Sequence, residues 1–583
     1  MRFLDLETDI LVAGGGLAGV CAAVSAARHG ARVVLLQDRS RLGGNSSSEV
    51  KMHVVGSNSH KSRPGWREGG LIEEFRLDDA ANNAQRCWEL WDLLLYDKVV
   101  SEPNITLLLE TTLYHADVQE SRISTVLARC DKSETAYRIK AKVFIDATGD
   151  SRLGLEAGAE MRTGREARSE FGESLAPEKA DNETLGSSIL FTSRLHRRPM
   201  PFTPPKWARK VTKDSLRFRN VGPENWEYGY WWIEWGGERD IIRDNERIRF
   251  ELLSIVTGVW DYIKNSGEHT DSANWALEWI GMMPGKRGSR RLLGDHILTQ
   301  NDLLSGAFPD AVAIGGWPMD DHPPGGFDRA DLPPNTVLRT AEVYDIPLRS
   351  LYSRNISNLM MAGRNISATH AAFTSTRVMA TCAVIGQAVG TAAAMCVERN
   401  ITPRQLARDS ALVTRLQQQL LRDDQTIKTV RNQDPSDLAR TAKFTASAGQ
   451  PELVIDGFVR SANGTHHWSA PLGSWIEMSW PAPKRIRELQ LTFDSGFQRE
   501  LTLSASDSIS RTIVRAPQPE TVRDYEILYR SGAEWKTLIK VAANHQRVNR
   551  HRFDPVEASA IRIRVDATNG IEEPRIFEIR AYA

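Results

Sequence analysis

The stretch "DILVAGGGLAGVCAA", residues 9–23, decides the fold of the first part of the chain. Its apolar run, 10–13, is typical of a buried strand in a parallel sheet. The glycines that follow have the spacing Gly14-x-Gly16-x-x-Gly19. In this spacing the first glycine permits a tight turn, the second lets the backbone approach a pyrophosphate, and the third packs the next helix on the sheet. The stretch therefore predicts a dinucleotide-binding turn.

The residues after this turn complete a βαβ unit. A helix is expected over 17–29 and a second strand over 32–36, within the length of about thirty residues that such a unit needs. The N-terminal N–H groups of the helix would face the phosphates. Where an acid usually bonds the adenosine ribose, the chain has Gln37, with Asp38 one residue later. We expect both to line the site, with the Gln37 amide offered to a ribose hydroxyl.

A second glycine-rich segment is "RLGGNSSSEVKMHVVGS" at 41–57. We expect it to be a loop under the cofactor that offers backbone amides and short polar side chains to it. The residues predicted to do so are Gly43, Gly44, Asn45 and Ser46. A surface turn is the alternative interpretation.

Composition excludes several classes of protein. Lys plus Arg and Asp plus Glu both total 74, so no net field favours nucleic acid or an anionic membrane. Five cysteines without regular spacing predict neither a zinc site nor a disulfide framework. The start "MRFLDLETD" is too acidic for a signal peptide, and no segment of about eighteen apolar residues is expected elsewhere. We expect a cytoplasmic protein with a small-molecule substrate and no active-site metal, and leave a homo-oligomer open.

The chain returns to the nucleotide-binding sheet twice. The strand in "VFIDATGD", 143–150, ends at Thr148 and Gly149, where the backbone would pass close to the cofactor. A later strand, 358–362, meets Gly363 and Arg364. A long helix rich in small residues is then expected over 375–396. We expect its N-terminal amides, near Thr374, Ser375 and Thr376, to face a site of negative charge.

Together these motifs resemble one family, the bacterial FAD-dependent oxidoreductases of the glutathione-reductase-like flavoprotein superfamily. The resemblance covers roughly residues 5–400 and rests on the first glycine motif together with Leu-Gly-Gly-Asn-Ser-Ser-Ser-Glu (42–49), Asp-Ala-Thr-Gly-Asp (146–150), Pro-Gly-Lys-Arg-x-Ser-Arg-Arg (284–291) and Ala-Gly-Arg-Asn-Ile-Ser-Ala-Thr-His (362–370). It implies FAD as the cofactor, because a plain NAD domain has no use for the return strand and late helix.

The resemblance also implies which residues contact FAD. Five glycines would hold the pyrophosphate: Gly14, Gly16, Gly19, Gly43 and Gly44. Thr148 and Gly149 would lie beside the adenine half. The ribityl chain and isoalloxazine would be approached by Gly363, Arg364, Gly386 and Gln387. Many relatives in the wider superfamily carry Ala-Gly-Asp where this chain has Ala-Gly-Arg, which leaves open whether a carboxylate bonds the ribityl chain.

Beyond a charged helical segment, short alternating strands predict an all-β sandwich. Val454-Ile455-Asp456-Gly457, Trp468 and the closing strands resemble the discoidin, or coagulation factor five/eight type C, jelly roll. That resemblance implies sugar binding through loops at one end and a structural calcium ion. A purely structural module, packed on the enzyme or mediating dimerisation, is the alternative.

The predicted fold is thus α/β: a Rossmann-type FAD-binding domain with an inserted α+β substrate domain, followed by a C-terminal jelly-roll sandwich. The predicted parts are 1–154 and 346–400 for FAD binding, 155–345 for the substrate domain, 401–440 for a helical segment and linker, and 441–583 for the sandwich.

Oxidation of an alcohol by a flavin requires a base for the hydroxyl proton. The loop "GGWPMDDHPPGG", 315–326, offers Asp321 and His322, and His322 is the candidate acid or base. Arg290 belongs to a cationic run that could bind a hydroxyl-rich or carboxylate ligand, and His370 precedes the late helix. A hydrogen-bonded structural histidine and salt-bridged arginines are the alternatives. His53 is a candidate for covalent flavin attachment.

Three functions follow from these features. The first is an FAD-dependent oxidoreductase that oxidises a CH–OH group of a carbohydrate or polyol. The sugar part of this hypothesis rests on the jelly roll and on the aromatic-rich insert, such as "NWEYGYWWIEWGG" at 225–237. The second is an NAD(P)H-using flavin monooxygenase, which no second glycine motif supports. The third is a glycan-binding protein with a structural flavin.

Overall fold

The structure is a computed structural model that describes residues 1–57, 65–462 and 464–583. The chain divides into two compact units, and each unit is built from three separate stretches of the sequence. Unit 1 contains Met1–Ser57, Arg86–Leu416 and Leu503–Thr512, and unit 2 contains Asn58–Gln85, Gln417–Thr502 and Ile513–Ala583. Unit 2 therefore includes a piece of the predicted FAD-binding part, and unit 1 includes a short piece of the predicted sandwich.

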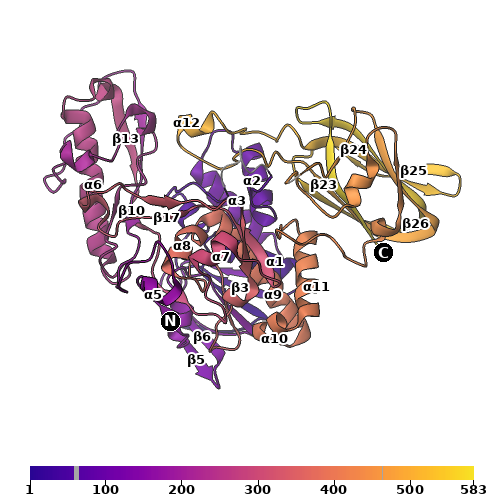
Figure 1. The fold of residues 1–583 in the computed structure, drawn as a ribbon, viewed down its shortest axis with the longest axis horizontal. Coiled ribbons are helices and arrows are strands. Elements are labelled where there is room, and N and C mark those ends of the chain that lie inside the picture. The colour runs from indigo at the N-terminus through magenta and orange to yellow at the C-terminus, as the bar shows by residue number, and fades with distance from the viewer. Residues whose placement is uncertain (58–64, 463) are drawn as a thin grey trace. The chain divides into compact units, whose positions relative to one another are not determined.

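Unit 1 is built around a five-stranded parallel sheet (Figure 1). Its strand order is β20-β8-β2-β3-β4, with bounds Leu359–Met361, Val143–Asp146, Ile10–Ala13, Val33–Leu36 and Ile105–Leu108. All residues of the four strands β20, β8, β2 and β3 are buried. The strand order reverses between β2 and β8. In open α/β sheets, ligands bind at the carboxyl ends of the strands at such a reversal, so the sheet places the candidate site where the sequence predicted it.

Helices α1 (Leu17–Arg28) and α9 (Met379–Arg399) pack against each other beside this sheet. A Cβ on Gly386 would overlap the Ala18 carbonyl, so the glycine permits a close helix crossing. Helix α9 is also long and apolar enough to cross a membrane, with a mean hydropathy of 1.6 in its most apolar window. The expectation of no such stretch is wrong for α9, but 94% of that window is buried inside the protein.

The predicted helix over 375–396 is two helices in the structure. Helix α8 (His370–Thr376) ends before Arg377, and α9 begins at Met379 after the extended residue Val378 (φ −69°, ψ 148°). The amides of Thr374, Ser375 and Thr376 therefore belong to the last turn of α8. The prediction that they form a helix N-terminus is wrong. The side chain of Arg377 turns inward and donates to the Asp320 carbonyl, and the next helix begins only after this residue.

A second sheet of unit 1 has the order β1-β7-β6-β5, with bounds Arg2–Glu7, Thr135–Lys140, Arg122–Cys130 and Thr112–Gln119. Strand β1 pairs in parallel with β7. It was not predicted from the sequence, in which the first expected strand is 10–13. The first residues thus close the edge of this sheet. The helices around these sheets include α3 (Trp88–Val100), α4 (Arg152–Glu156), α7 (Gln300–Ser305) and α10 (Pro403–Arg408), and α11 (Ser410–Arg422) crosses the boundary between the units.

The inserted part of unit 1 is the α+β region that the sequence predicted. It holds the sheet β12-β10-β14 (Glu234–Trp235, Ser187–Ser188, Gly285–Lys286), the pairs β11-β13 (Phe191–Leu195, Trp275–Ile280), β16-β19 (Ala311–Gly315, Tyr344–Pro347) and β17-β18 (Met319–Asp321, Thr336–Leu338), and α6 (Asn245–Asn265). Its aromatic residues form a buried cluster against α6, which lies beside β13 (Figure 1). Most of these aromatic side chains are core, whereas Trp231 is 38% exposed.

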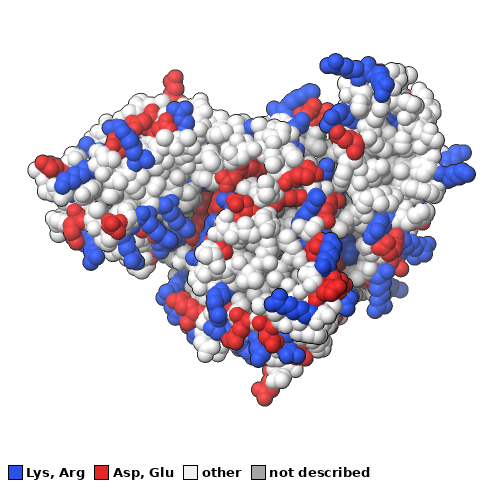
Figure 2. Space-filling view, turned by 180° about the vertical axis from the view of Figure 1, so that it is seen from behind, with Lys and Arg blue, Asp and Glu red and all other residues white. Residues whose placement is uncertain are grey.

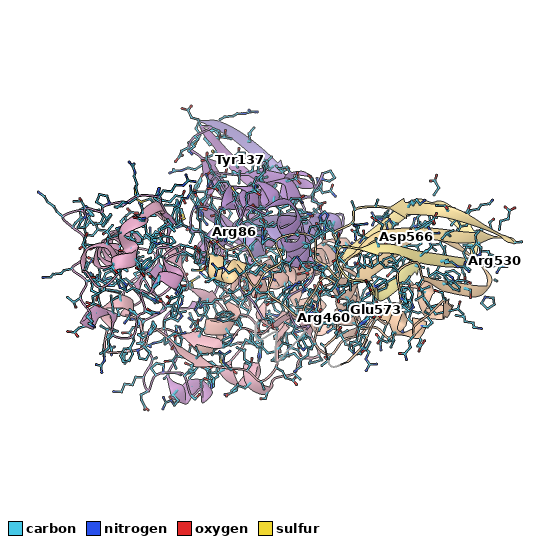
Figure 3. The ribbon with its side chains drawn as sticks, turned by 90° about the horizontal axis from the view of Figure 1, so that it is seen from above. Arg86, Tyr137, Arg460, Arg530, Asp566 and Glu573 are labelled. Carbon is cyan, nitrogen blue, oxygen red and sulfur yellow. The ribbon has the colours of Figure 1, made fainter. Side chains whose placement is uncertain are left out.

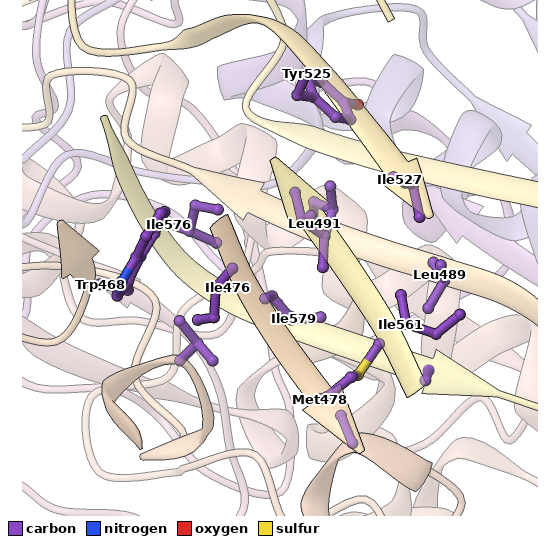
Figure 4. Close-up of a cluster of buried hydrophobic side chains, with 14 of the residues drawn as sticks. Trp468, Ile476, Met478, Leu489, Leu491, Tyr525, Ile527, Ile561, Ile576 and Ile579 are labelled. Carbon is purple, nitrogen blue, oxygen red and sulfur yellow. The ribbon is translucent and has the colours of Figure 1, made fainter. Parts of the chain in front are cut away.

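Unit 2 contains the predicted jelly-roll sandwich. The long strands β23 (Trp475–Phe493) and β26 (Val548–Thr568) pair with each other along most of their length, with register breaks between Ser479 and Lys484 and between Ile486 and Glu488. They are joined by β21 (Lys443–Ala446), β22 (Trp468–Ser469), β24 (Val522–Ser531), β25 (Glu534–Val541) and β27 (Arg575–Tyr582). The inward residues of these strands form one apolar core, shown in Figure 4. The all-β prediction for this region is confirmed.

Loops of the sandwich hold the segment 65–83, which carries α2 (Leu71–Asn82). Arg67 is fully buried and pairs with Glu73 at 2.6 Å, and Glu73 accepts a hydrogen bond from Ser495 at 2.6 Å. Arg515 pairs with Asp79 at 2.8 Å. Further contacts to this segment come from Arg460, His545, Gln546 and the carbonyls of Ser495, Gly496 and Arg499. These loop groups therefore make contacts within unit 2 itself.

On the face shown in Figure 2, Lys and Arg side chains are interspersed with Asp and Glu side chains. This agrees with the equal totals of 74 cationic and 74 anionic residues.

Candidate functional site

Two glycine segments meet at the carboxyl end of β2. Gly14 has φ +102°, and a Cβ there would overlap the Ala147 carbonyl of the neighbouring strand end. The N–H of Gly43 donates to the Gly15 carbonyl at 2.8 Å, and Gly16 and Gly43 form a bridge. The structure thus brings the turn at 14–16 and the loop at 43–44 side by side, as the sequence predicted.

The space in front of this turn fits a diphosphate. An ideal Cβ on Gly16 would meet no atom within 4 Å. The backbone of Gly16 (φ −65°, ψ 174°) would also suit any other residue. Helix α1 begins at Leu17 with no side-chain cap and no acid in its first turn. Its first N–H groups and positive dipole end are therefore available to an anion. An open, uncapped helix start behind a glycine is the cradle that a dinucleotide pyrophosphate requires.

The side chain of Gln37 contacts the glycine turn, and its predicted bond to a ribose hydroxyl stays a prediction. Its side-chain oxygen accepts the Gly15 N–H at 2.8 Å, and its amide nitrogen donates to the Arg41 carbonyl at 3.0 Å. The side chain is 3% exposed and braces the glycine turn against the loop that follows β3. Asp38 is the exposed acid at this strand end, with 65% of its side chain accessible, and it is left as the candidate ribose ligand.

Ser46 also has a structural role. Its hydroxyl donates to the Gly43 carbonyl at 2.8 Å and accepts the Trp91 indole N–H at 3.1 Å, and the residue is fully buried. The loop thus uses this hydroxyl internally, and its predicted contact with the cofactor stays a prediction. Asn45 donates to the Lys286 carbonyl at 3.0 Å and so joins this loop to β14.

Asp146, at the end of β8, organises the next part of the site and was missed as a site residue. It accepts the Thr148 N–H at 3.0 Å, the Thr148 hydroxyl at 2.7 Å and the Gly154 N–H at 2.8 Å. Burial raises the pKa of its carboxyl despite these hydrogen bonds. The signal for it was visible: an acid directly after an apolar strand. Thr148 is therefore held by Asp146, and Gly149 keeps the left-handed φ of +75°.

Arg364 forms an ion pair rather than standing free. Its guanidinium contacts Asp150 at 2.7 Å, and Lys286 contacts the same carboxylate at 2.7 Å. Burial works to raise the pKa of Asp150, but the charges of Arg364 and Lys286 outweigh it and lower the pKa to about 2. Arg290 donates to the Asp150 carbonyl at 3.2 Å. Arg290 thus belongs to this cluster, and the structure does not bring it to the predicted histidines.

Two of the remaining predicted cofactor residues lie on α9. Gly386 packs against Ala18 of α1, where the two helices cross. Gln387 is 1% exposed, and its carbonyl accepts the Ser25 hydroxyl at 3.1 Å. Gly363 has φ +110°, at the end of β20 beside Ala18 of α1. Of these three, Gly363 lies at the carboxyl end of the sheet, where the cofactor is expected.

His322 lies between two carboxylates. Its Nδ1 is 2.5 Å from Glu234, and its Nε2 is 3.3 Å from Asp320. Burial by itself would lower the pKa of His322, but the charge of Glu234 and the hydrogen bonds to both acids outweigh it and raise the pKa. The ring is thus held as a buried cation with both nitrogens engaged. This geometry favours the alternative of a hydrogen-bonded structural histidine, and the role of His322 as an acid or base stays a prediction.

His370 has one ring nitrogen in contact with an acid and one without a hydrogen-bond partner among the described residues. Its Nε2 contacts Asp321 at 3.1 Å, while its Nδ1 is buried and has no hydrogen-bond partner among the described residues. Burial works to raise the pKa of Asp321, but the hydrogen bond and charge of His370 outweigh it and lower the pKa. Asp321 therefore stays ionised and orients the ring. The backbone N–H of His370 donates to Glu166 at 2.8 Å, which fixes the start of α8.

Arginines surround these histidines. Arg287 lies 3.4 Å from Glu234, and Arg377 lies 3.7 Å from Asp320. Burial lowers the pKa of Arg377 to about 10, and the nearby cation Arg287 adds to this effect. Arg291 pairs with Glu166 at 2.7 Å. The sequence marked Arg287 and Arg291 only as part of a cationic run. Glu234 and Glu166 were not singled out because they are distant in sequence from both histidines, and Arg377, seven residues after His370, was not singled out either.

No group of three or more His, Cys, Asp or Glu side chains that could hold a metal ion occurs within the described ranges. The structural calcium ion implied by the jelly-roll resemblance gains no support. His53 contacts Tyr228, with its Nδ1 3.1 Å from the phenol oxygen. Its covalent attachment to a flavin stays a prediction.

The parallel sheet, the paired glycine segments and the two returning strands define the class: a flavoprotein with a Rossmann-type dinucleotide-binding domain. The profile of the family described as FAD dependent oxidoreductase matches residues 9–420. The chain belongs to this family, and it is an FAD-dependent oxidoreductase.

Solved structures similar to this chain cover its C-terminal quarter. They include the family 32 carbohydrate-binding module of Streptococcus pneumoniae EndoD (18% identity, 25% of this chain and 99% of that chain, TM-score 0.20). Another is chitosan-binding module 1 from a chitosanase/glucanase of Paenibacillus sp. IK-5 (15% identity, 25% and 98%, TM-score 0.19). A third is the family 32 module of C. perfringens NanJ in complex with galactose (13% identity, 25% and 98%, TM-score 0.19). A comparison with curated proteins finds no match.

Proposed function

We propose that this flavoprotein oxidises a CH–OH group of a carbohydrate or polyol-like substrate. When bound, FAD supplies the acceptor for the hydride that leaves the carbon. The protein must then remove the hydroxyl proton and hold the substrate in place. The proposal assigns the first task to His370 and the second to the polar and aromatic side chains around it.

The unpartnered Nδ1 of His370 carries this proposal. A buried polar atom without a partner costs free energy, on the order of 1–3 kcal/mol, unless a ligand satisfies it. With Asp321 accepting the proton of Nε2 at 3.1 Å, Nδ1 presents its lone pair. This arrangement lets His370 accept a hydroxyl proton while Asp321 stabilises the imidazolium that forms. Asp321 is thus a positioning residue in this proposal.

His322 has a different part in the same cluster. It is a buried cation that pairs with Glu234 and Asp320, and it donates its backbone N–H to Asp321 at 3.1 Å. This contact holds the Asp321 carboxylate in the orientation that His370 needs. His322 therefore acts through Asp321 in our proposal.

The surroundings suit a hydroxyl-rich substrate. Trp231 is 38% exposed, and its ring centroid lies 5.3 Å from that of His322, so it offers a flat apolar face. Glu234 Oε1 and Thr184 Oγ1 are buried without partners among the described residues. A Cβ on Gly288 would lie 2.8 Å from both Thr184 Oγ1 and the ring of Phe373, so Thr184 and Phe373 lie close together. Hydroxyl groups would satisfy the two unpartnered oxygen atoms.

Anaerobic bleaching of the bound flavin tests the proposal. Wild-type protein is mixed with a panel of sugars, glycosides and polyols, and the loss of oxidised flavin absorbance is followed in time. We expect at least one of them to reduce the flavin, and His370→Gln to slow this reduction by about 100-fold or more, because general base catalysis contributes about 10²–10⁴-fold. If no member of the panel reduces the flavin and NADPH does so rapidly, the substrate class is wrong and the monooxygenase hypothesis replaces it.

His296→Gln is the matched control. His296 also contacts an aspartate, Asp302 at 3.0 Å, but this aspartate lies in the first turn of α7, where it forms a capping box with Thr299. In the control variant the substrate should reduce the bound flavin as fast as in the wild type. If both histidine variants slow the reaction equally while binding FAD normally, His370 has no special role as a base.

A further inference from the structure

A short segment of the C-terminal sequence belongs to the oxidoreductase unit. Residues Leu503–Thr512, which carry α12 (Asp507–Ser510), cluster with unit 1 although the residues on both sides belong to unit 2. Asp507 contacts the Arg86 guanidinium at 2.6 Å, and Arg86 also donates to the Ser510 hydroxyl at 3.0 Å. Figure 3 labels Arg86 next to the yellow helix α12.

Arg86 fixes the start of α3. It has a left-handed backbone with φ +62° and directly precedes Cys87, the N-cap residue of this helix. A non-glycine residue in this region is held there by its surroundings, at a cost of order 1–3 kcal/mol. The ion pair with Asp507 is the contact that holds its side chain. The position of α3 thus depends on the segment 503–512.

Helix α3 in turn holds the cofactor loop. The Trp91 indole donates to the Ser46 hydroxyl at 3.1 Å. Asp92 accepts the backbone N–H of Ser48 at 3.0 Å and its hydroxyl at 2.6 Å. Ser46 donates to the Gly43 carbonyl, and Gly43 lies against the glycine turn of β2. The backbone of α3, which follows Arg86 in the chain, and these hydrogen bonds therefore join Arg86 to the phosphate cradle.

A second set of contacts reaches the same loop further along the chain. The Asp507 N–H donates to Glu227 at 2.6 Å. The next residue, Tyr228, donates its phenol to the Lys51 carbonyl at 2.6 Å and accepts the His53 N–H at 3.1 Å. Asp507 thus engages both supports of the loop, through its carboxylate on one side and its backbone N–H on the other.

From these contacts we infer that the segment 503–512 positions the cofactor loop at 43–53, so that FAD binding requires the C-terminal part of the chain. Arg86 and Asp507 are positioning residues for FAD. The inference rests on the family's cofactor and is independent of the proposed substrate.

Asp507→Pro in the full chain tests this inference. The substitution removes both the carboxylate and the N–H of residue 507. Proline is tolerated at the first position of a helix, and Ser506 before it is already extended (φ −76°, ψ 125°). We expect the dissociation constant for FAD, measured by titration of flavin fluorescence, to rise about 10-fold, which corresponds to the loss of about one net hydrogen bond in the supports of the loop. We also expect faster hydrogen exchange at the amides of 43–53.

Two further variants decide between positioning and a general structural effect. Asp524→Asn breaks the exposed pair with Arg523 in the sandwich and should leave FAD binding unchanged. The charge swap Arg86→Asp with Asp507→Arg should restore FAD affinity relative to Arg86→Asp alone, since aspartate tolerates the left-handed backbone. The inference is overturned if Asp507→Pro binds FAD within 2-fold of the wild type, or if it lowers the unfolding temperature without changing FAD affinity or exchange in the loop.

Discussion

The substitution Gly16→Ala separates FAD binding from folding. Gly16 has an ordinary extended backbone, and an added Cβ meets nothing within 4 Å. The methyl group would enter the space that we assign to the pyrophosphate. We therefore expect the free energy of unfolding of the FAD-free variant to lie within about 1 kcal/mol of that of the FAD-free wild type.

The effect on FAD should be much larger. The methyl group would push the phosphates away from the N–H groups at the start of α1. Each hydrogen bond to a charged group contributes about 1.5–3 kcal/mol, so the loss of one weakens binding by roughly 10- to 150-fold. Titration of both FAD-free proteins with FAD, combined with urea unfolding, measures the two quantities separately.

Gly19→Ala provides the contrast. A Cβ there would overlap the carbonyl oxygen of Gly14, so this variant should lose both stability and FAD affinity. A Gly16→Ala protein that binds FAD as tightly as the wild type would refute the placement of the pyrophosphate. So would a Gly16→Ala protein that is as unstable as Gly19→Ala.

Two more predictions concern stability. Gly386→Ala should destabilise the protein by about 1–3 kcal/mol or more, because the new Cβ would overlap the Ala18 carbonyl of α1; calorimetry checks this, and an unchanged unfolding temperature would contradict the tight helix crossing. Burial raises the pKa of Asp437 to about 6. The folded state thus holds this proton more tightly than the unfolded state, so the stability from Asp437 is complete below about pH 4 and falls by up to about 3 kcal/mol as the pH rises through 6. Urea unfolding from pH 4 to 8 should show this fall in the wild type and a smaller one in Asp437→Asn, and equal pH profiles would contradict it.

Local motifs made the nucleotide-binding half predictable. The strand over 10–13 was predicted with its observed bounds, because its apolar run and the glycines after it are contiguous in sequence. The segment 71–100, in which apolar residues recur at helical intervals, shows the limit of such reasoning. Periodicity identifies its helices, but α2 clusters with unit 2 and α3 with unit 1, a division that depends on contacts with residues more than 300 positions away.

The candidate catalytic residues were harder to predict. The sequence grouped Asp321 with His322, yet strand alternation in β17 sends neighbouring side chains to opposite faces. Asp320 and His322 thus share one face, and Asp321 meets His370 from a distant segment. The alternation could have been used from the sequence, whereas the pairing with His370 depends on the tertiary fold. The cytoplasmic location and the oligomeric state stay predictions.

Hydrogen exchange of the full-length protein with and without FAD tests the central claim most directly. We claim that the glycine turn at 14–19 and the loop at 43–48 form one FAD site. FAD should slow exchange at the amides of both segments together and leave the strands of the sandwich unchanged. Protection of only one segment, or binding of FAD with no protection at either, would contradict the account.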